Sequence, residues 1–131
     1  MTQALNAAGH ILVPANTTGD FTVSLPWKPR RVVLLGSAYA GNANGVSHGI
    51  ATLDQEGVGG DAWQLTVFRW VRGGVGGNNH VTQKALYVID LVSGQNNCYG
   101  KVVFPGNLTF ILRVEVNTGL GGVYVFWYAA P

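Results

Sequence analysis

The chain has 131 residues, 47% of them hydrophobic and only 11% charged, and its formal net charge is +2. Globular proteins carry about 25% charged residues, and disordered chains are highly charged and poor in apolar residues, so this composition excludes disorder. The eight Lys and Arg residues are scattered, which excludes the concentrated basic face of a nucleic-acid-binding protein. Low charge combined with four Trp, five Tyr and five Phe residues indicates that neighbouring chains cover much of the surface.

We expect neither secretion nor membrane association. The sequence lacks the basic segment and short apolar region of a signal peptide, and it lacks an apolar run of about 18 residues that could span a membrane. Cys98 is the only cysteine, so an internal disulfide is excluded. We expect a half-buried structural thiol, because no residue near Cys98 in sequence offers the base that a nucleophilic thiolate needs.

The first 19 residues are small and polar, apart from a short apolar stretch at 11–13 that Pro14 ends. Two interpretations fit this segment equally well: a flexible arm that becomes ordered on a partner, or an edge strand. The domain boundaries that we predict follow the first interpretation, with an N-terminal arm over 1–19 and a β-sandwich domain over 20–131.

Between residues 20 and 104, six stretches have the composition of strands, because apolar, β-branched and aromatic residues gather or alternate there. They cover residues 21–25, 31–35, 49–53, 62–71, 84–92 and 99–104. Stretches rich in Gly, Asn, Ser or Asp separate several of them, and we expect loops at 36–47, 54–61 and 72–79. In the longest strand, the face that includes Gln64 changes from polar to aromatic, ending at Trp70.

The last stretch predicts a hairpin. From 107 to 116 apolar residues alternate with mostly polar ones, as in a strand with one buried face. Residues 117–122 supply the Asn and Gly of a turn. The return strand, 123–128, is apolar and aromatic on both faces. One face can belong to the core, whereas the other needs a second cover.

These elements predict an all-β protein with about eight strands and no helix. Strand length and turn spacing are typical of a single-domain antiparallel β-sandwich with a jelly-roll-like arrangement.

The sequence contains no catalytic, cofactor or metal motif that we can identify. The Gly-rich loops lack the phosphate-binding patterns, and His10, His48 and His80 lack metal-ligand spacing. Three acids around one loop, at 54, 56 and 61, match a calcium loop only weakly. We therefore expect no enzyme, no cofactor and no bound metal.

Four aromatic residues form the candidate oligomer interface: Trp70, Tyr124, Phe126 and Tyr128. Three interpretations remain open for them. They are buried under a second sheet, or form a subunit interface, where desolvated aromatic residues are enriched, or stack on a sugar.

Several segments, taken in order, resemble small β-domains encoded among tailed-bacteriophage structural genes. Residues 18–23 (TGDFTV) and 27–35 (WKPRRVVLL) resemble the opening motif of these domains, T-G-x-x-x-V followed by F-x-P-x-x-V. Residues 48–51 (HGIA) and 83–89 (QKALYVI) are similar to a short strand and the central strand of these domains.

The C-terminal part carries the most specific resemblance. Residues 102–104 (VVF), 106–110 (GNLTF) and 122–129 (GVYVFWYA) resemble V-x-F-x-x-x-G-F-T-L followed by G-x-x-V-x-Y-x-A. The order is preserved over residues 17–130, although Asn107-Leu108 replaces the usual Gly-Phe and the strand over 63–71 is longer and more aromatic.

The resemblance implies a non-enzymatic virion structural protein, assembled in the bacterial host cytoplasm, without a catalytic residue to carry over. It implies a homo-oligomer, most often a trimer, that decorates the capsid or acts as a minor capsid protein on the major capsid protein. The alternative is a lectin-like module of the tail or fibre that binds host glycans through the polar loops at 36–47 and 73–79, since recognition often lies on loops of a rigid scaffold.

Overall fold

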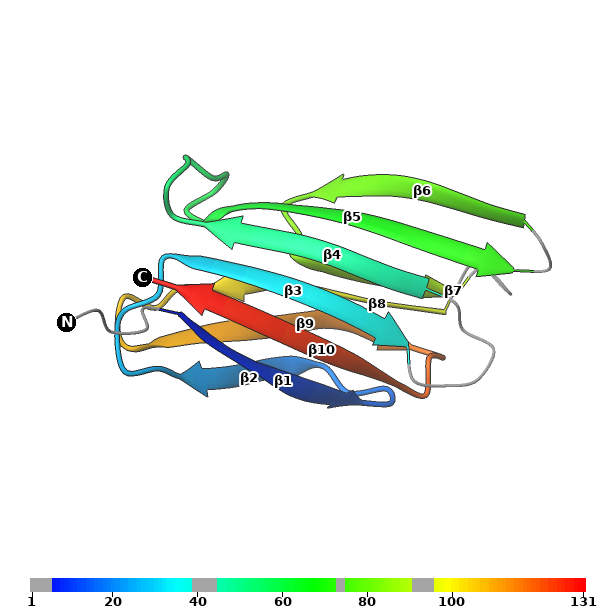
Figure 1. Cartoon of the computed structure of the whole chain (residues 1–131). Helices are drawn as coiled ribbons and strands as arrows, with labels where there is room; N and C mark the ends of the chain where they lie inside the picture. Colours follow the sequence, from blue (N-terminus) through cyan, green and yellow to red (C-terminus); the bar gives the residue numbers. More distant parts are fainter. Residues whose placement is uncertain (1–5, 39–44, 73–74, 91–95) are drawn as a thin grey trace.

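The computed structural model describes residues 6–38, 45–72, 75–90 and 96–131, without the side chains of 70–72, 75–78, 90 and 96. Two antiparallel sheets pack face to face (Figure 1). In sheet order, the six-stranded sheet consists of β1 (Ala7–Pro14), β10 (Gly122–Ala130), β3 (Arg31–Ala38), β4 (Gly45–Thr52), β5 (Trp63–Arg72) and β6 (Val75–Thr82). The four-stranded sheet consists of β2 (Gly19–Ser24), β9 (Thr109–Thr118), β8 (Asn96–Val103) and β7 (Leu86–Asp90).

The predicted all-β sandwich is confirmed, with ten strands in the described residues instead of about eight. One additional strand is β1, which pairs with β10 along its whole length. Of the two interpretations of the N-terminal segment, residues 7–14 therefore adopt the edge strand, and the sheet begins at Ala7, not at residue 20. Its alternation explains this position, because Ile11 and Val13 pack on the core while Leu12 points outward.

The other additional strand is β6, which occupies most of the predicted loop at 72–79. That prediction was wrong because it relied on the glycines and asparagines of this segment. An edge strand can form through backbone hydrogen bonds to one neighbour, and β6 pairs with β5 from Val75 to Thr82. The predicted loop at 36–47 is shorter for the same reason, since β3 and β4 extend into it from both sides.

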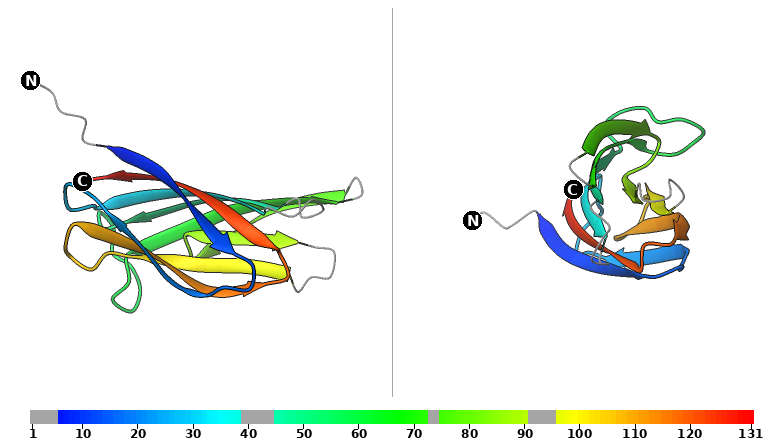
Figure 2. Two further views of the ribbon diagram at one scale, coloured as in Figure 1. Left: turned by 90° about the horizontal axis from the view of Figure 1, so that it is seen from below. Right: turned by 90° about the vertical axis from the view of Figure 1, so that its right-hand side faces the viewer.

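The start and the end of the chain lie together. β1 pairs with β10 and β2 pairs with β9, as in a jelly roll, whereas β3 to β6 follow one another as neighbours. Seen end-on, the six-stranded sheet curls around the four-stranded one without closing into a barrel (Figure 2). Each sheet therefore has an inner face on the core and an outer face.

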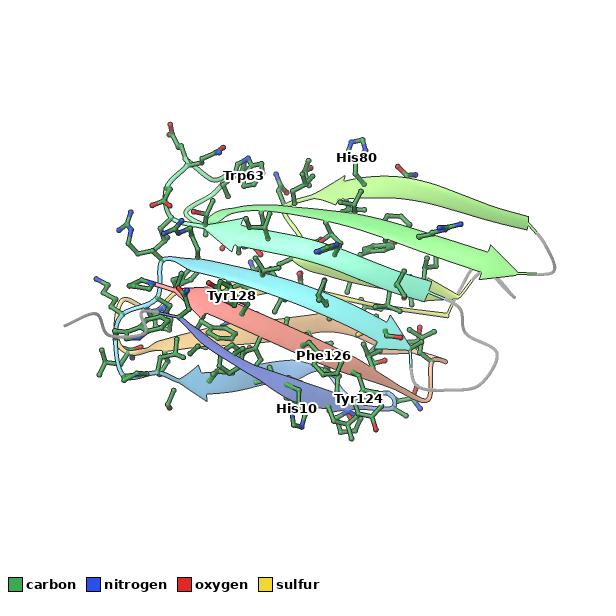
Figure 3. All side chains as sticks on the ribbon, in the orientation of Figure 1. His10, Trp63, His80, Tyr124, Phe126 and Tyr128 are labelled. Carbon is green, nitrogen blue, oxygen red and sulfur yellow. The ribbon has the colours of Figure 1, made fainter. Side chains whose placement is uncertain are left out.

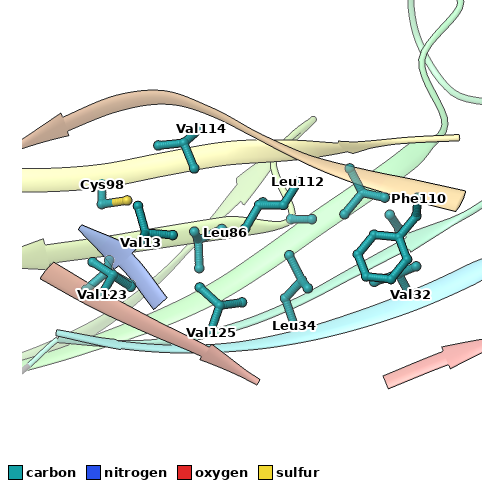
Figure 4. Packing of buried hydrophobic residues seen from close by; sticks show 14 of the residues in the cluster. Val13, Val32, Leu34, Leu86, Cys98, Phe110, Leu112, Val114, Val123 and Val125 are labelled. Atoms are coloured by element: carbon teal, nitrogen blue, oxygen red, sulfur yellow. The ribbon is translucent and has the colours of Figure 1, made fainter. Parts of the chain in front are cut away.

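The core lies between the two inner faces (Figure 4). Alternate residues of β9 and β10 supply its centre, with Phe110, Leu112, Val123 and Val125 fully buried. Trp127 of β10 packs against this cluster and meets Phe110 edge-on, with ring centroids 5.4 Å apart. The alternation that predicted one buried face for each strand of the hairpin is correct here.

The alternation in β9 shifts near its end. Tyr99 is opposite Val116 while Gly100 is opposite Val114, so Glu115 is an extra residue in the strand, which is a β-bulge. The bulge turns Asn117 inward, although our pattern placed Val116 on the buried face. The Asn117 Nδ2 donates to the backbone oxygens of Pro14 (2.8 Å) and Thr17 (3.0 Å). The bulge thus anchors the turn between β1 and β2.

Candidate interaction surface

The outer face of the six-stranded sheet carries a continuous apolar surface. Antiparallel register brings one residue of each strand into a row across the sheet. The central row, in sheet order, is His10, Phe126, Leu35, His48, Val67 and His80. His10, Phe126, Tyr124 and Tyr128 lie on or beside β10 and β1, and His80 lies on the opposite edge of the sheet (Figure 3). We call this surface the outer face.

Six large apolar side chains of the outer face remain about half exposed. They are Phe126 (55%), Val67 (52%), Leu12 (49%), Val46 (49%), Leu35 (44%) and Tyr128 (44%). Together these exposed portions amount to on the order of 500 Å², which is near the upper end for a contiguous apolar patch on a soluble monomer. A patch of this size is characteristic of an interaction site.

A groove of about 450 Å³ runs through the middle of the outer face. The side chains of its walls are Leu35, Val46, His48, Val67, Arg69 and Phe126. Ser37, in register with Tyr124 and Val46 on this face, also lines the groove, and its small side chain leaves room between the larger neighbours. A second groove, of about 320 Å³, adjoins it beside Val33, Ile50 and Leu65. The face therefore offers depressions that apolar side chains of a partner can fill.

Charge is nearly absent from the outer face. Among the described side chains of its strands, only Arg69 and, at the end of the sheet, Arg31 are always charged, and none is a carboxylate. Asp54 follows β4 at the end of the sheet. It forms ion pairs with Arg30 (3.2 Å) and Arg31 (3.5 Å). An apolar partner surface can therefore cover the central rows without burying a carboxylate.

The outer face of the four-stranded sheet has the opposite character. Asp20 pairs with Arg113 (2.8 Å), Lys101 pairs with Asp61 (2.9 Å), and Lys84 pairs with Glu115. Hydrogen bonding to the Arg113 guanidinium holds the pKa of the Asp20 carboxyl below its usual value. Exposed ion pairs of this kind contribute little to stability, but they suit a surface that faces water.

Three of the four predicted interface residues lie on the outer face, namely Tyr124, Phe126 and Tyr128. The side chain of Trp70 lies outside the described residues, and only its place on β5, opposite Gly45 and Gly77, is defined.

Sequence reasoning missed the apolar residues that the other strands add to this surface. These are Leu12, Leu35, Val46 and Val67. Alternation within each strand could have indicated that they share a face, but only the register between strands shows that they adjoin β10.

The residues considered for metal binding or catalysis are not brought together. The three histidines come from different strands. His48 and His80, the nearer pair, are two strands apart, which is about 10 Å at the usual strand spacing. No group of three His, Cys, Asp or Glu residues in the described part of the chain could hold a metal ion. The carboxylates of Asp54 and Asp61 are engaged in ion pairs.

Cys98 is fully buried in the core instead of half-buried (Figure 4). Burial raises the pKa of its thiol to about 12. A thiol of this kind stays protonated near neutral pH and is a poor nucleophile.

Comparisons with family models, with curated proteins and with solved structures gave no match. None of the described segments is a helix long and apolar enough to cross a membrane.

Proposed function

We propose that this chain is a non-enzymatic structural protein that assembles with copies of itself through the outer face of the six-stranded sheet. The contrast between the two outer faces carries this proposal. One is apolar, grooved and free of described carboxylates, while the other is covered by ion pairs. A protein that met water on both sides would gain nothing from keeping Phe126, Val67 and Leu35 half exposed.

The size of the outer face supports a second copy as its occupant. Six strands at about 4.8 Å spacing, with about eight residues each at 3.3 Å, give an area on the order of 600 Å². A standard protein interface buries about 800 Å² on each partner. The face and its rim are therefore large enough for a stable subunit contact. Phe126 of β10 lines the central groove, and binding energy is usually concentrated towards the middle of an interface.

The setting that we propose is the particle of a tailed bacteriophage. Here the support is the resemblance of residues 17–130 to small β-domains encoded among phage structural genes. On this proposal the chain forms a homo-oligomer, with three copies as the expected number. It binds other virion proteins such as the major capsid protein, and it decorates or stabilises the capsid.

The interface is tested by a charge placed in the wall of its central groove. We expect Phe126→Asp to convert the oligomer into monomers or aggregates, because a carboxylate without a partner is costly to bury. The matched control is Ile111→Asp, which makes the same kind of change on the outer face of the four-stranded sheet. Light scattering measures the mass of both. A Phe126→Asp chain that keeps the native mass would rule out this interface.

The setting is tested by gold labelling of intact particles with an antibody to this chain. Label spread over the shell is the expected outcome. Label confined to the tail or its tip would favour the alternative below, and absence of the chain from purified particles would contradict the virion proposal altogether.

A glycan-binding module of the tail or fibre is the second candidate. One observation favours it: a groove of about 260 Å³ where the indole of Trp63 adjoins Thr82 and Gln83. An aromatic ring with hydroxyl and amide groups beside it can stack on a sugar and hydrogen-bond its hydroxyls. We would screen the native chain and Trp63→Ala against host surface glycans. Binding that is lost in Trp63→Ala would support this candidate, and no binding would exclude it.

A further inference from the structure

All three histidines of the chain lie on the outer face, in its central row. His10 is on the edge strand β1, His48 is on the interior strand β4, and His80 is on the other edge strand β6. Their side chains are exposed in the free chain. The opposite outer face, whose charges are all carboxylates, lysines and arginines, has none. The only side chains that change charge just below neutral pH are thus confined to the apolar surface.

The surroundings of the imidazoles are almost entirely apolar. His10 adjoins Phe126, with ring centroids 6.4 Å apart. His48 lies between Leu35 of β3 and Val67 of β5, and His80 lies beside Val67 from the other side.

The other titratable or charged side chains on the described outer face are few. They are Arg69 on β5, Tyr124 and Tyr128 on β10, and Arg31 with its partner Asp54 at the end of the sheet. Asp54 is engaged by two arginines, and no described strand residue of the outer face carries a carboxylate. A proton gained by any of the three histidines would add an uncompensated positive charge to the apolar surface.

We propose that this histidine row makes self-association through the outer face pH-dependent, with assembly at neutral and alkaline pH and release in mild acid. The inference rests on the proposed function. The direction of this pH dependence follows from the linkage between proton binding and assembly. Covering the face with a second copy removes water from the imidazoles and favours their neutral form. The free chain therefore binds more protons than the assembled chain, and lowering the pH through the histidine range shifts the equilibrium towards the free chain.

The three histidines do not contribute equally. His48 lies in the wall of the central groove, together with Phe126 and Val67, where a partner excludes water most completely. His10 and His80 lie on the two edge strands (Figure 3), where water can still reach them at the rim of an interface. We therefore expect His48 to account for most of the pH dependence.

Sedimentation equilibrium of the full chain at pH 8 and pH 5.5, at constant ionic strength, tests the inference. We expect an oligomer at pH 8 and a dissociation constant raised about tenfold or more at pH 5.5. His48→Gln, which stays neutral, should reduce this shift. His48→Lys, which is charged at both pH values, should dissociate at pH 8 as well.

The outcomes separate the inference from the function on which it rests. A native chain that is monomeric at pH 8 would overturn both. An oligomer of equal affinity at both pH values would overturn the inference alone. So would a shift that persists when all three histidines are replaced by Gln, because other groups would then cause it. Circular dichroism at both pH values controls for folding, and unfolding at pH 5.5 would count against the inference.

Discussion

At the scale of single residues, burial decides what Cys98 can do. It lies in β8 opposite Val88 and Asn117, fully buried, and the pKa of its thiol is raised to about 12. Deprotonation of a native thiol therefore begins only in strong alkali, whereas a cysteine of the unfolded chain ionises with a pKa of about 8.5. The same side chain is inert when folded and reactive when unfolded.

We expect N-ethylmaleimide to leave the native chain unmodified at pH 8, and to modify it completely in denaturant at the same pH. Mass spectrometry after a timed quench measures the modified fraction. A small peptide that contains one cysteine, added to the same reaction, confirms that the reagent is active. Rapid modification of the native chain would mean that Cys98 is not sealed in the core.

A residue's neighbours across the sandwich also decide which glycines can be replaced. A Cβ built on Gly49 would lie 1.7 Å from the backbone oxygen of Ala85, so β4 would have to move away from the segment that leads into β7. On Gly36 the nearest atom would be a terminal side-chain carbon of Leu86, at 2.5 Å, which can move by rotating the side chain.

We therefore expect Gly49→Ala to lower the free energy of unfolding by more than the 1–3 kcal/mol that is usual for overpacking, roughly 3 kcal/mol or more, and Gly36→Ala to stay within that range. Urea denaturation of both variants measures the difference. Equal effects would contradict the close approach of the backbones at Gly49.

At the scale of elements, one side chain joins the sheets where strand pairing ends. The Nε2 of Gln64 on β5 donates to the Val102 oxygen (2.9 Å), and the Val102 N–H donates to Oε1 of Gln64 (2.7 Å). Leu86, the first residue of β7, pairs with Gly100 of β8. Val102 lies two residues further along β8, where β7 no longer runs beside it. The buried amide thus takes the place of a neighbouring strand.

Replacing this amide should leave two buried backbone groups without partners. We expect Gln64→Leu to cost about 2–6 kcal/mol of unfolding free energy, since each of the two unsatisfied groups costs about 1–3 kcal/mol. Gln55→Leu, the same change on an exposed loop residue, is the control and should be nearly neutral. Chemical denaturation measures both, and a neutral Gln64→Leu would show that water or another group satisfies Val102.

The sequence predicted the elements whose pattern is local and missed those that depend on a neighbour. Alternation in β9 and β10, with the glycines of their turn, indicated the hairpin and its buried face. The edge strand β6 is rich in Gly and Asn, and it is a strand because β5 pairs with it. The bulge at Glu115 depends on the register with Tyr99 and Gly100, which no local pattern encodes.

The candidate surface shows the same limit. Tyr124, Phe126 and Tyr128 were identifiable because one strand with two apolar faces needs a cover on each side. Leu35 and Val67 join them only through the register of three further strand pairs. The histidines appeared unrelated because their spacing in sequence says nothing about their shared row.

At the scale of the whole molecule, the two outer faces of the sandwich differ in character. The apolar face suits a partner, and the face with the ion pairs suits water. If assembly uses the outer face of the six-stranded sheet, oxidation by hydroxyl radicals should drop there and nowhere else. We expect Phe126, Tyr128 and Leu35 to be oxidised several-fold less in the oligomer than in the same chain diluted below its dissociation constant, because bulk water no longer reaches them. Ile111, on the outer face of the four-stranded sheet, should not change.

Peptide mass spectrometry after a millisecond exposure measures these rates at matched radical dose. Protection of both outer faces would indicate collapse into an aggregate in place of a directed contact. Protection confined to the four-stranded sheet would place the interface on the charged side, where Asp20 and Arg113 would then have to exchange their pairing for contacts with another copy. Only protection of the apolar side agrees with a sandwich whose ion pairs remain in water while its aromatic strand is covered.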